Sequence, residues 1–377
     1  DIIVYGASGF TGRLVAEYLA KQGIQKWAMA GRSLSKLTQV RDEMGLPSDT
    51  PLVIADASTP ATLIDMCKRT RVVLTTVGPY QLYGPELVAA CAETGTDYVD
   101  LCGEPAWMRQ MIDAHDDAAK ASGARIVFSC GFDSIPFDLG VWFLQQEAVK
   151  THGKPAPRVK GRVRKMQGGA SGGTIASLTE TMKAAAKNQK IIGLLKSSFA
   201  LTPGFEGPSQ PSGMMPEYDS ATGTWTAPFV MAPINTKNVH RTNFLLGHAY
   251  GRDFVYDEMI MTTLGDAGRA MAEAIAKANP FGDSKIAPGD GPSKEERENG
   301  FYDVLFIGEY PDGTQVRASV QGDKDPGYGS TSKMIAESAL TLLETDTPGG
   351  VVTPGAIIAA PLKARLVANA GLTFGVE

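Results

Sequence analysis

Short apolar runs alternate with helix-like patterns along the first 150 residues. The runs have the length of buried strands in a parallel sheet, and they lie at residues 2–4, 26–31, 52–55, 71–77, 98–101 and 125–129. Between them, apolar side chains recur at helical spacing, at residues 13–22, 61–70, 84–94 and 106–121. This succession predicts an α/β fold with an N-terminal Rossmann-type, doubly wound parallel sheet.

The pattern changes after residue 150. Residues 159–166 alternate apolar and polar side chains, which predicts a half-exposed antiparallel strand, and a helix is expected over 172–187. The runs 302–310 and 314–320 flank Pro311-Asp312-Gly313, a strong signal for a β-hairpin. An apolar stripe predicts a helix over 330–343, and one more helix with a short end is expected after Thr353. We therefore expect an α+β second domain, whose exposed hairpin sheet would pair with a second subunit.

Residues 202–233 form a long segment rich in proline, glycine and serine. Such a segment inside a compact protein is typical of a functional flap. Two interpretations stay open, because the apolar side chains would either cover a long substrate or pack the core of the second domain. These side chains are Phe205, Met214, Met215, Tyr218, Trp225 and Phe229.

A glycine turn joins the first apolar run to the first helix. Its sequence is Gly6-Ala7-Ser8-Gly9-Phe10-Thr11-Gly12. Gly6 permits a tight turn, Gly9 allows the backbone to approach a pyrophosphate, and Gly12 lets helix pack on strand. Unpaired N–H groups at the start of the helix favour phosphate. We therefore predict that these seven residues bind a dinucleotide.

The residues after the second run indicate which dinucleotide binds. An NAD site usually has a carboxylate there for the ribose 2′-hydroxyl, whereas an NADP site has a cation for the 2′-phosphate. This chain has Arg32 and Ser33, with Lys36 one helical turn later, which favours NADP(H) over NAD or a flavin. Asp56, after the third run, would lie at the adenine edge or would cap the next helix.

Composition limits the remaining possibilities. A chain of 377 residues is long for one core, so two domains are expected. The net charge is −5 and the basic residues are dispersed, which argues against nucleic acid. Four cysteines without a C-x-x-C pair and four scattered histidines predict reduced thiols of a cytoplasmic protein and no metal site. No run of about 18 apolar residues predicts a transmembrane helix, while peripheral membrane contact stays open.

Three loops at the carboxyl ends of the predicted strands carry the candidate chemistry, because ligands of such sheets bind at that edge. The first, Val77-Gly78-Pro79-Tyr80 and on to Gly84, is expected beside the nicotinamide. The second, 100–104, carries two carboxylates, and its Glu104 would anchor a loop. The third, 130–138, opens a helix, with Asp133 or Ser134 as its cap and Pro136 in its first turn.

These residues resemble a known family. The Gly6–Gly12 turn, Ala30-Gly31-Arg32, Val77-Gly78-Pro79-Tyr80, the segment 98–104 and the segment 131–140 are similar to those of saccharopine dehydrogenase-like oxidoreductases. The later segments 172–177, 288–297 and 327–332 are similar to the branch of trans-acting enoyl reductases. The resemblance extends along nearly the whole chain.

The resemblance implies an organisation and an activity. It implies an NADP-binding Rossmann domain over 1–134, completed by 327–377, with a substrate and dimerisation domain inserted over 135–326. It also implies reduction of a carbon–carbon double bond on a lipid or polyketide thioester that a separate synthase presents. We therefore expect an apolar small-molecule or carrier-bound substrate and a homodimer.

An enoyl reduction needs a group that stabilises the enolate and a proton donor. Tyr80 and Tyr83 are the first candidates, since their loop is expected near the nicotinamide. Asp133, Ser134 and Tyr328 are the second. Each has a structural alternative: helix capping explains Asp133 and Ser134, and packing beside Pro79 explains Tyr80.

Two other functions stay open. One is NADP-linked reduction of an imine to a secondary amine, as in lysine-pathway relatives, whose polycarboxylate substrate would need clustered arginines. The candidates are Arg158, Arg162, Arg164, Arg241, Arg252 and Arg317. The other is a lipid-associated scaffold that binds NADP without turnover.

Overall fold

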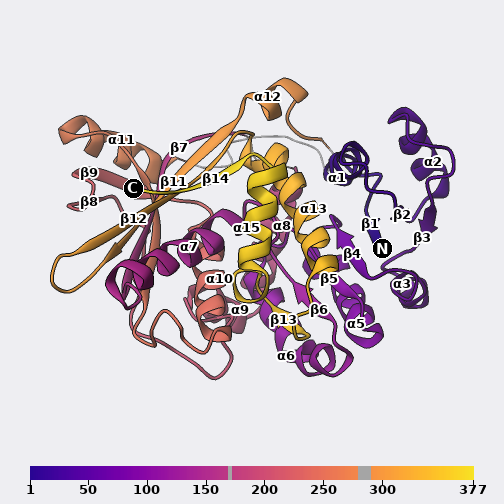
Figure 1. The fold of residues 1–377 in the computed structure, drawn as a ribbon, viewed down its shortest axis with the longest axis horizontal. Helices are drawn as coiled ribbons and strands as arrows, with labels where there is room; N and C mark the ends of the chain where they lie inside the picture. The colour runs from indigo at the N-terminus through magenta and orange to yellow at the C-terminus, as the bar shows by residue number, and fades with distance from the viewer. Residues whose placement is uncertain (169–171, 279–289) are drawn as a thin grey trace.

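The computed structural model of the chain describes residues 1–168, 172–278 and 290–377 (Figure 1). Within the helix that begins at Gly172, the side chains of residues 172–175 also lie outside the description. The predicted motif 288–297 starts at Pro288 and Gly289, which are not among the described residues. Two seven-stranded sheets organise the described part.

The first sheet is parallel throughout, in the order β13-β6-β5-β4-β1-β2-β3. This confirms the predicted Rossmann-type α/β fold. Helices cover it, which is why its strands are almost wholly apolar. The strands are β1 (Ile2–Tyr5), β2 (Trp27–Gly31), β3 (Leu52–Ile54), β4 (Val72–Thr75), β5 (Asp97–Val99), β6 (Arg125–Val127) and β13 (Gly350–Val352). The helices are α1 (Phe10–Lys21), α2 (Leu34–Glu43), α3 (Pro60–Cys67), α4 (Tyr80–Tyr83), α5 (Pro85–Thr94), α6 (Pro105–Ser122) and α13 (Thr331–Glu344).

The second sheet is mixed, in the order β14-β12-β11-β7-β10-β9-β8. The predicted hairpin is confirmed as β11 and β12, where Glu309 pairs with Gln315 beside the turn. The strands are β7 (Arg158–Gln167), β8 (Glu217–Asp219), β9 (Thr224–Pro228), β10 (Val255–Met261), β11 (Phe301–Glu309), β12 (Gln315–Gly322) and β14 (Leu372–Val376). The remaining helices are α7 (Ile135–His152), α8 (Gly172–Lys187), α9 (Gln189–Lys196), α10 (Ala232–Leu245), α11 (Gly265–Lys277), α12 (Lys294–Asn299), α14 (Pro354–Ile357) and α15 (Ala359–Asn369).

Two details of this sheet differ from the sequence prediction. β7 was expected as an antiparallel strand, yet it pairs parallel to β10 and antiparallel to β11 in the middle of the sheet. The hairpin was expected at the sheet edge, but β14 pairs antiparallel with β12 and covers it. Neither pairing is visible in local sequence, because both partners lie far away along the chain.

The two sheets share a continuous apolar core. It runs from Val4 on β1 through Phe137 on α7 to Phe306 on β11 and Leu362 on α15. Figure 1 shows α13 and α15 between the sheets, and α13 contacts α1, β4 and α15. A buried polar contact reinforces this packing, because Tyr18 on α1 donates to Oε1 of Glu337 on α13 at 2.6 Å. The described domains therefore form one packed body.

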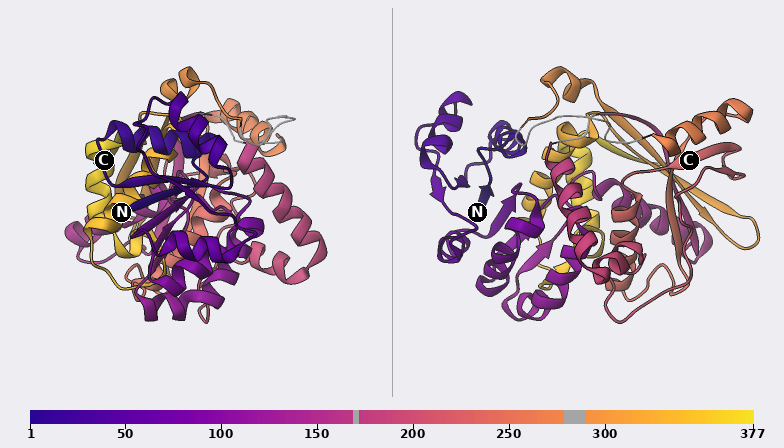
Figure 2. Two further views of the ribbon diagram at one scale, coloured as in Figure 1. Left: turned by 90° about the vertical axis from the view of Figure 1, so that its right-hand side faces the viewer. Right: turned by 180° about the vertical axis from the view of Figure 1, so that it is seen from behind.

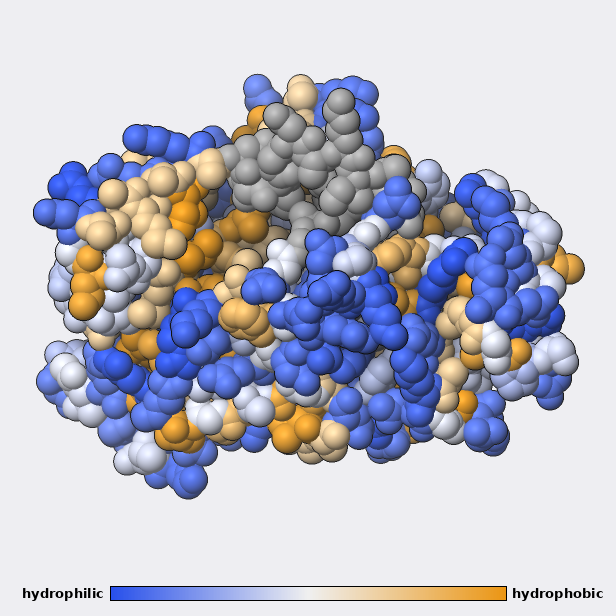
Figure 3. All heavy atoms as spheres, turned by 90° about the horizontal axis from the view of Figure 1, so that it is seen from above, coloured by the Kyte–Doolittle hydropathy of each residue, from blue (hydrophilic) through white to orange (hydrophobic). Residues whose placement is uncertain are grey.

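The segment 202–233 contains both buried and exposed apolar side chains. The sequence left open whether these side chains pack the core or cover a substrate. Phe229 is buried and packs on Phe137 with ring centroids 5.5 Å apart. Met214, Met215 and Tyr218 are 63, 71 and 57% exposed. Figure 3 shows a largely hydrophilic face on which apolar residues emerge in groups.

Among the described helices, none combines the length and apolarity that a bilayer span requires.

Candidate nucleotide and substrate site

The glycine turn between β1 and α1 has the geometry that a dinucleotide needs. Gly6 has φ +90°, a conformation that favours glycine. A Cβ on Gly12 would lie 2.1 Å from the carbonyl oxygen of Gly6, so only glycine allows α1 to pack this closely. Gly9 is the N-cap of α1, and no side chain caps the helix there. The turn therefore leaves the first N–H groups of α1, at Phe10, Thr11 and Gly12, to face a phosphate.

Arg32 and its neighbours follow β2 at the edge where the ribose would lie. Arg32 is exposed, and within the described ranges it has no hydrogen-bond or ion-pair partner. Ser33 is the N-cap of α2, and its Oγ accepts from the N–H of Lys36 at 3.3 Å. An exposed, unpaired guanidinium at this position fits a 2′-phosphate. Ser33 and Lys36 also belong to the start of a helix, where the dipole favours an anion.

Asp56 does not cap the next helix, which was one of its two interpretations. The N-cap of α3 is Thr59. Asp56 instead closes a short turn, because its Oδ1 accepts from the backbone N–H and the hydroxyl of Ser58 at 2.9 and 2.8 Å. These hydrogen bonds to Ser58, followed by the more distant charge of Arg32, hold the pKa of Asp56 below its usual value.

Glu104 fixes the loop that follows β4. Its two carboxylate oxygens accept from the backbone N–H groups of Tyr80 and Gln81 at 2.8 and 2.9 Å. Glu104 is 2% exposed, so these two bonds satisfy a buried charge. The anchoring role expected for Glu104 is what the structure shows. Val77, Gly78 and Pro79 thereby present their backbone at the carboxyl edge of the sheet, and residues 80–83 form the short helix α4 instead of a loop.

The two tyrosines of this loop lie in different environments. The hydroxyl of Tyr80 accepts from the N–H of Leu101 at 3.1 Å, and its ring lies 5.8 Å from that of Trp107. Tyr80 is 5% exposed, and burial raises the pKa of its hydroxyl above the usual 10. Tyr83 is 42% exposed at the end of α4. Packing therefore accounts for Tyr80 without a role in the reaction, whereas the catalytic role of Tyr83 stays a prediction.

The loop between β6 and α7 differs from the expected helix cap. Ser134 occupies the N-cap position, but its side chain does not bond to the helix. Its Oγ instead accepts from Nδ2 of Asn238 on α10 at 2.8 Å. Asp133 is partly buried, has no hydrogen-bond partner among the described residues, and has its pKa raised by burial to about 7. Capping thus explains neither side chain, and both remain available for chemistry.

A buried polar cluster on α10 and β10 supports this loop. Glu258 accepts from Nδ2 of Asn235 and from the hydroxyl of Tyr256, each at 2.9 Å. Burial, opposed by these hydrogen bonds, raises the pKa of Glu258 well above 4.5, and the charge of Asp133 adds to the rise. Sequence reasoning missed Asn235, Asn238 and Glu258. The available signal was the composition of α10, whose buried residues are mostly polar.

Tyr328 packs against the glycine turn. It lies on the short π-helix η1 (Pro326–Ser330), and its ring packs edge-on against Phe10 at 4.8 Å. The carboxylate of Asp325 accepts from the N–H groups of residues 327–329 and holds this turn. The β6–α7 loop binds next to this turn, because the N–H of Phe132 donates to Oγ1 of Thr331 at 2.9 Å. These contacts link Phe10, Tyr328 and the β6–α7 loop.

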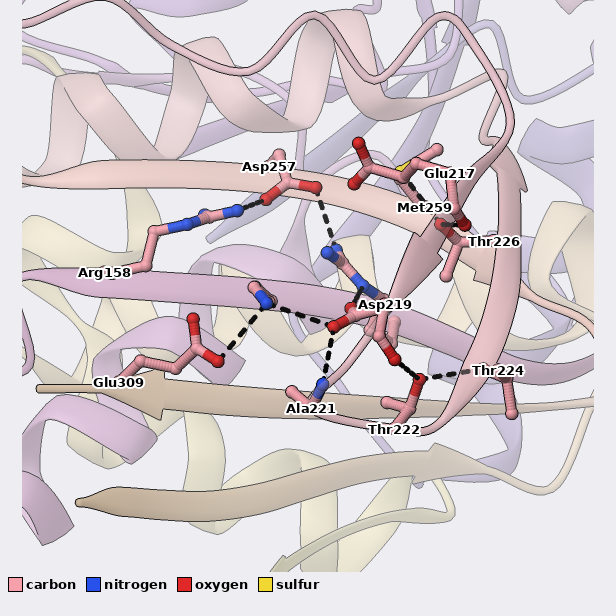
Figure 4. Close-up of polar contacts among 12 residues, drawn as sticks. Arg158, Glu217, Asp219, Ala221, Thr222, Thr224, Thr226, Asp257, Met259 and Glu309 are labelled. Carbon is pink, nitrogen blue, oxygen red and sulfur yellow. Dashed lines mark hydrogen bonds and ion pairs between the residues drawn. The ribbon is translucent and has the colours of Figure 1, made fainter. Parts of the chain in front are cut away.

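The arginines of the second sheet are paired within the protein. Figure 4 shows Arg158 on Asp257, with Asp219 and Glu309 in the same network. Arg162 is fully buried and donates to Asp219 at 2.7 Å and to Asp257 at 2.9 Å. Lys160 joins Asp219 and Glu309 at 3.0 and 3.2 Å. This network fastens the β8–β9 hairpin to β7 and leaves little positive charge for a ligand.

The remaining candidate arginines are engaged as well. Arg164 pairs with Asp303 and Glu377 at 2.8 and 2.7 Å. Arg241 donates to backbone carbonyls, including that of Leu201 at 2.5 Å. Arg317 donates to the carbonyl of Ala221 and to Gln315, and Arg252 lies 4.9 Å above the ring of Phe205. In the described part of the chain, no group of three His, Cys, Asp or Glu side chains is arranged to hold a metal.

Comparison with known proteins agrees with this geometry. Residues 2–127 match the model of the saccharopine dehydrogenase NADP binding domain. A trans-acting enoyl reductase of Mycobacterium ulcerans is 39% identical over 400 residues, covering 97% of this chain and 95% of the relative. The chain belongs to the trans-acting enoyl reductase family. A relative of that name in Mycobacterium tuberculosis is 38% identical and covers 100% of this chain and 97% of its own length.

A solved structure supports the fold independently. The apo saccharopine dehydrogenase (L-Glu forming) of Saccharomyces cerevisiae has a TM-score of 0.56 at 12% identity, covering 100% of this chain and 99% of that one. The family assignment and NADP(H) as the cofactor, both predicted from sequence, are confirmed. This member of the trans-acting enoyl reductase family is an NADP-dependent oxidoreductase, and the contacts of the glycine turn and Arg32 with that cofactor stay a prediction.

Proposed function

We propose that the protein uses NADPH to reduce the enoyl double bond of a lipid or polyketide-type thioester. The carrying observation is the pairing of the arginines in the second domain. A saccharopine-type substrate has several carboxylates, which would need free guanidinium groups. In the described chain, five of the six candidate arginines donate to protein oxygens and Arg252 packs on Phe205. A thioester with an apolar acyl chain makes no such demand.

The cofactor would be held by the glycine turn, Arg32, Ser33 and Lys36, and it supplies a hydride for one alkene carbon. Glu104 holds the loop 77–81 at the expected nicotinamide edge, so that Gly78 and Pro79 shape the pocket with backbone alone. Glu104 itself is used in holding this loop, and it does not place its carboxyl group at the reacting carbon.

We propose Asp133 as the proton donor for the second alkene carbon. Its pKa of about 7 keeps a useful fraction protonated near neutrality. Ser134 would stabilise the developing enolate, because Asn238 donates to its Oγ and leaves the hydroxyl proton free to be donated. Both residues stand on the loop after β6, at the carboxyl edge where ligands of such sheets bind.

The same proposal includes the organisation of the chain. Residues 1–134, completed by 327–371, would form the nucleotide domain, and residues 135–326 with β14 the substrate domain, because β13 pairs with β6 whereas β14 pairs with β12. A homodimer, a cytoplasmic location and a role in lipid metabolism are also proposed. Light scattering of the purified protein tests the dimer.

The test is a comparison of substrates. Oxidation of NADPH is followed at 340 nm with crotonyl-N-acetylcysteamine and with the imine formed from lysine and 2-oxoglutarate. Reduction of the thioester and not of the imine supports the proposal. Reduction of the imine alone would refute it, and tight NADPH binding without turnover of either substrate would favour the scaffold.

A further inference from the structure

The helix pair α8–α9 lies on the surface beside the loop that follows β4. Nε2 of Gln81 donates to Oγ1 of Thr181 on α8 at 3.4 Å, and a Cβ built on Gly78 would lie 3.7 Å from Oγ of Ser177. Farther along, α9 contacts α6. Figure 2 shows the pair at the outside of the molecule in its left view. The pair therefore stands between solvent and the expected nicotinamide loop.

The outer side of this pair exposes apolar side chains. Leu178 and Met182 lie one helical turn apart on α8 and are 42 and 61% exposed, and Ile192 on α9 is 38% exposed. None of the residues of α9 is buried. The inner side is different, because Thr181, Ala184 and Ile191 line a small cavity together with Gln81 and Trp107. The pair thus has one face toward the site and one apolar face without a partner in the described protein.

The charge of this segment is opposite to that of the chain. Residues 172–196 contain four lysines and one glutamate, a net charge of +3 in a protein of net charge −5. Lys183 pairs with Glu180 at 2.7 Å. The other three, Lys187, Lys190 and Lys196, are exposed and have no ion-pair partner among the described residues. A helix pair that exposes apolar side chains and unpaired lysines suits an acidic protein surface.

We propose that the outer face of α8–α9 binds an acidic carrier domain that presents the acyl thioester. The inference rests on the proposed function, since it names the partner of the same site. A domain bound there would have its tethered thioester beside Gly78 and Gln81, at the expected nicotinamide loop. The three apolar side chains, Leu178, Met182 and Ile192, would pack against this domain, and the lysines would attract its acidic groups. The lysines would also accelerate encounter with the acidic partner.

The test reverses the three unpaired lysines. The variant Lys187→Glu/Lys190→Glu/Lys196→Glu is compared with a matched variant, Lys26→Glu/Lys68→Glu/Lys277→Glu, which makes the same change of charge at exposed lysines elsewhere in the chain. The probes are crotonyl-N-acetylcysteamine and an acyl carrier protein whose phosphopantetheine arm bears a crotonyl group. Circular dichroism and thermal melts confirm that both variants fold.

We expect kcat/KM for the carrier-bound substrate to fall about tenfold or more in the α8–α9 variant at low salt, while the free thioester reacts at the unchanged rate. The matched variant should keep both rates. Equal rates for the α8–α9 variant and the wild type, or equal losses in the two variants, would overturn the proposal.

Binding separates a failed docking surface from a failed function. Fluorescence anisotropy of the labelled carrier protein is measured without turnover, in 50 and 300 mM NaCl. Salt-sensitive binding that is lost only in the α8–α9 variant supports the docking surface even when neither thioester is reduced. Binding that survives in this variant overturns it, as does capture by anionic phosphatidylglycerol vesicles in place of the carrier.

Discussion

Arg32→Ala should weaken NADPH binding much more than NADH binding. Arg32 follows β2 as an exposed guanidinium without a partner in the described protein, so the substitution removes no internal contact. A charge-assisted hydrogen bond to a phosphate contributes about 1.5–3 kcal/mol. Exposure and salt reduce this, and the lower half of the range corresponds to roughly a 10- to 40-fold loss in affinity for NADPH.

The assay is fluorescence titration of NADPH and of NADH at 50 and 300 mM NaCl. The NADH affinity should change less than twofold, because that cofactor has no 2′-phosphate, and the difference between the two cofactors should shrink at high salt. Arg69→Ala, at another exposed arginine of the first domain, is the matched control and should alter neither affinity. Equal losses for the two cofactors in Arg32→Ala would refute the assignment of the 2′-phosphate contact.

Three further substitutions test the site. Asp133→Asn should lower kcat about 100-fold or more. In the wild type the rate should fall as pH rises through about 7, because the donor must be protonated. A pH profile shared by wild type and variant would exclude Asp133 as the donor. Tyr80→Phe should cost about 1 kcal/mol of stability, since the N–H of Leu101 loses its acceptor, with kcat kept within twofold; a large loss of kcat at unchanged melting temperature would instead place Tyr80 in the chemistry. Glu258→Gln should raise the melting temperature more at pH 8 than at pH 5. The reason is that the pKa of Glu258 is raised, so that the buried carboxylate becomes destabilising as pH rises through that pKa. An equal effect at both pH values would contradict the buried environment of Glu258.

The glycine turn and the place of Arg32 at the end of β2 were predictable because their signals are local. Gly6, Gly9 and Gly12 lie within one short turn of the chain, and Arg32 directly follows β2. The hairpin at Pro311–Gly313 was predictable for the same reason. These features depend on backbone conformation and chain direction, which short sequences specify.

The substrate half depends on contacts that sequence patterns do not show. Asn238 reaches Ser134 across 104 positions of the chain, and Glu258 meets Asn235 across 23. Ser134 is the N-cap residue of α7, as one of the two predicted alternatives has it, but its side chain makes no capping hydrogen bond and its hydroxyl oxygen accepts from Asn238. Tyr80 was expected near the nicotinamide because of its loop, yet loop position does not determine which way a ring turns, and Leu101 and Trp107 hold it inside.

The return of the chain end to both sheets constrains how the protein can be divided. The first sheet needs β13 after the second domain has been made, and the second sheet needs β14 after that. A gene fragment that ends at residue 134 would therefore lack β13, and a fragment that covers residues 135–326 would lack β14, so that each sheet would lose an edge strand. We therefore expect new substrate preferences in this family to arise by change within loops and surface helices rather than by exchange of whole domains.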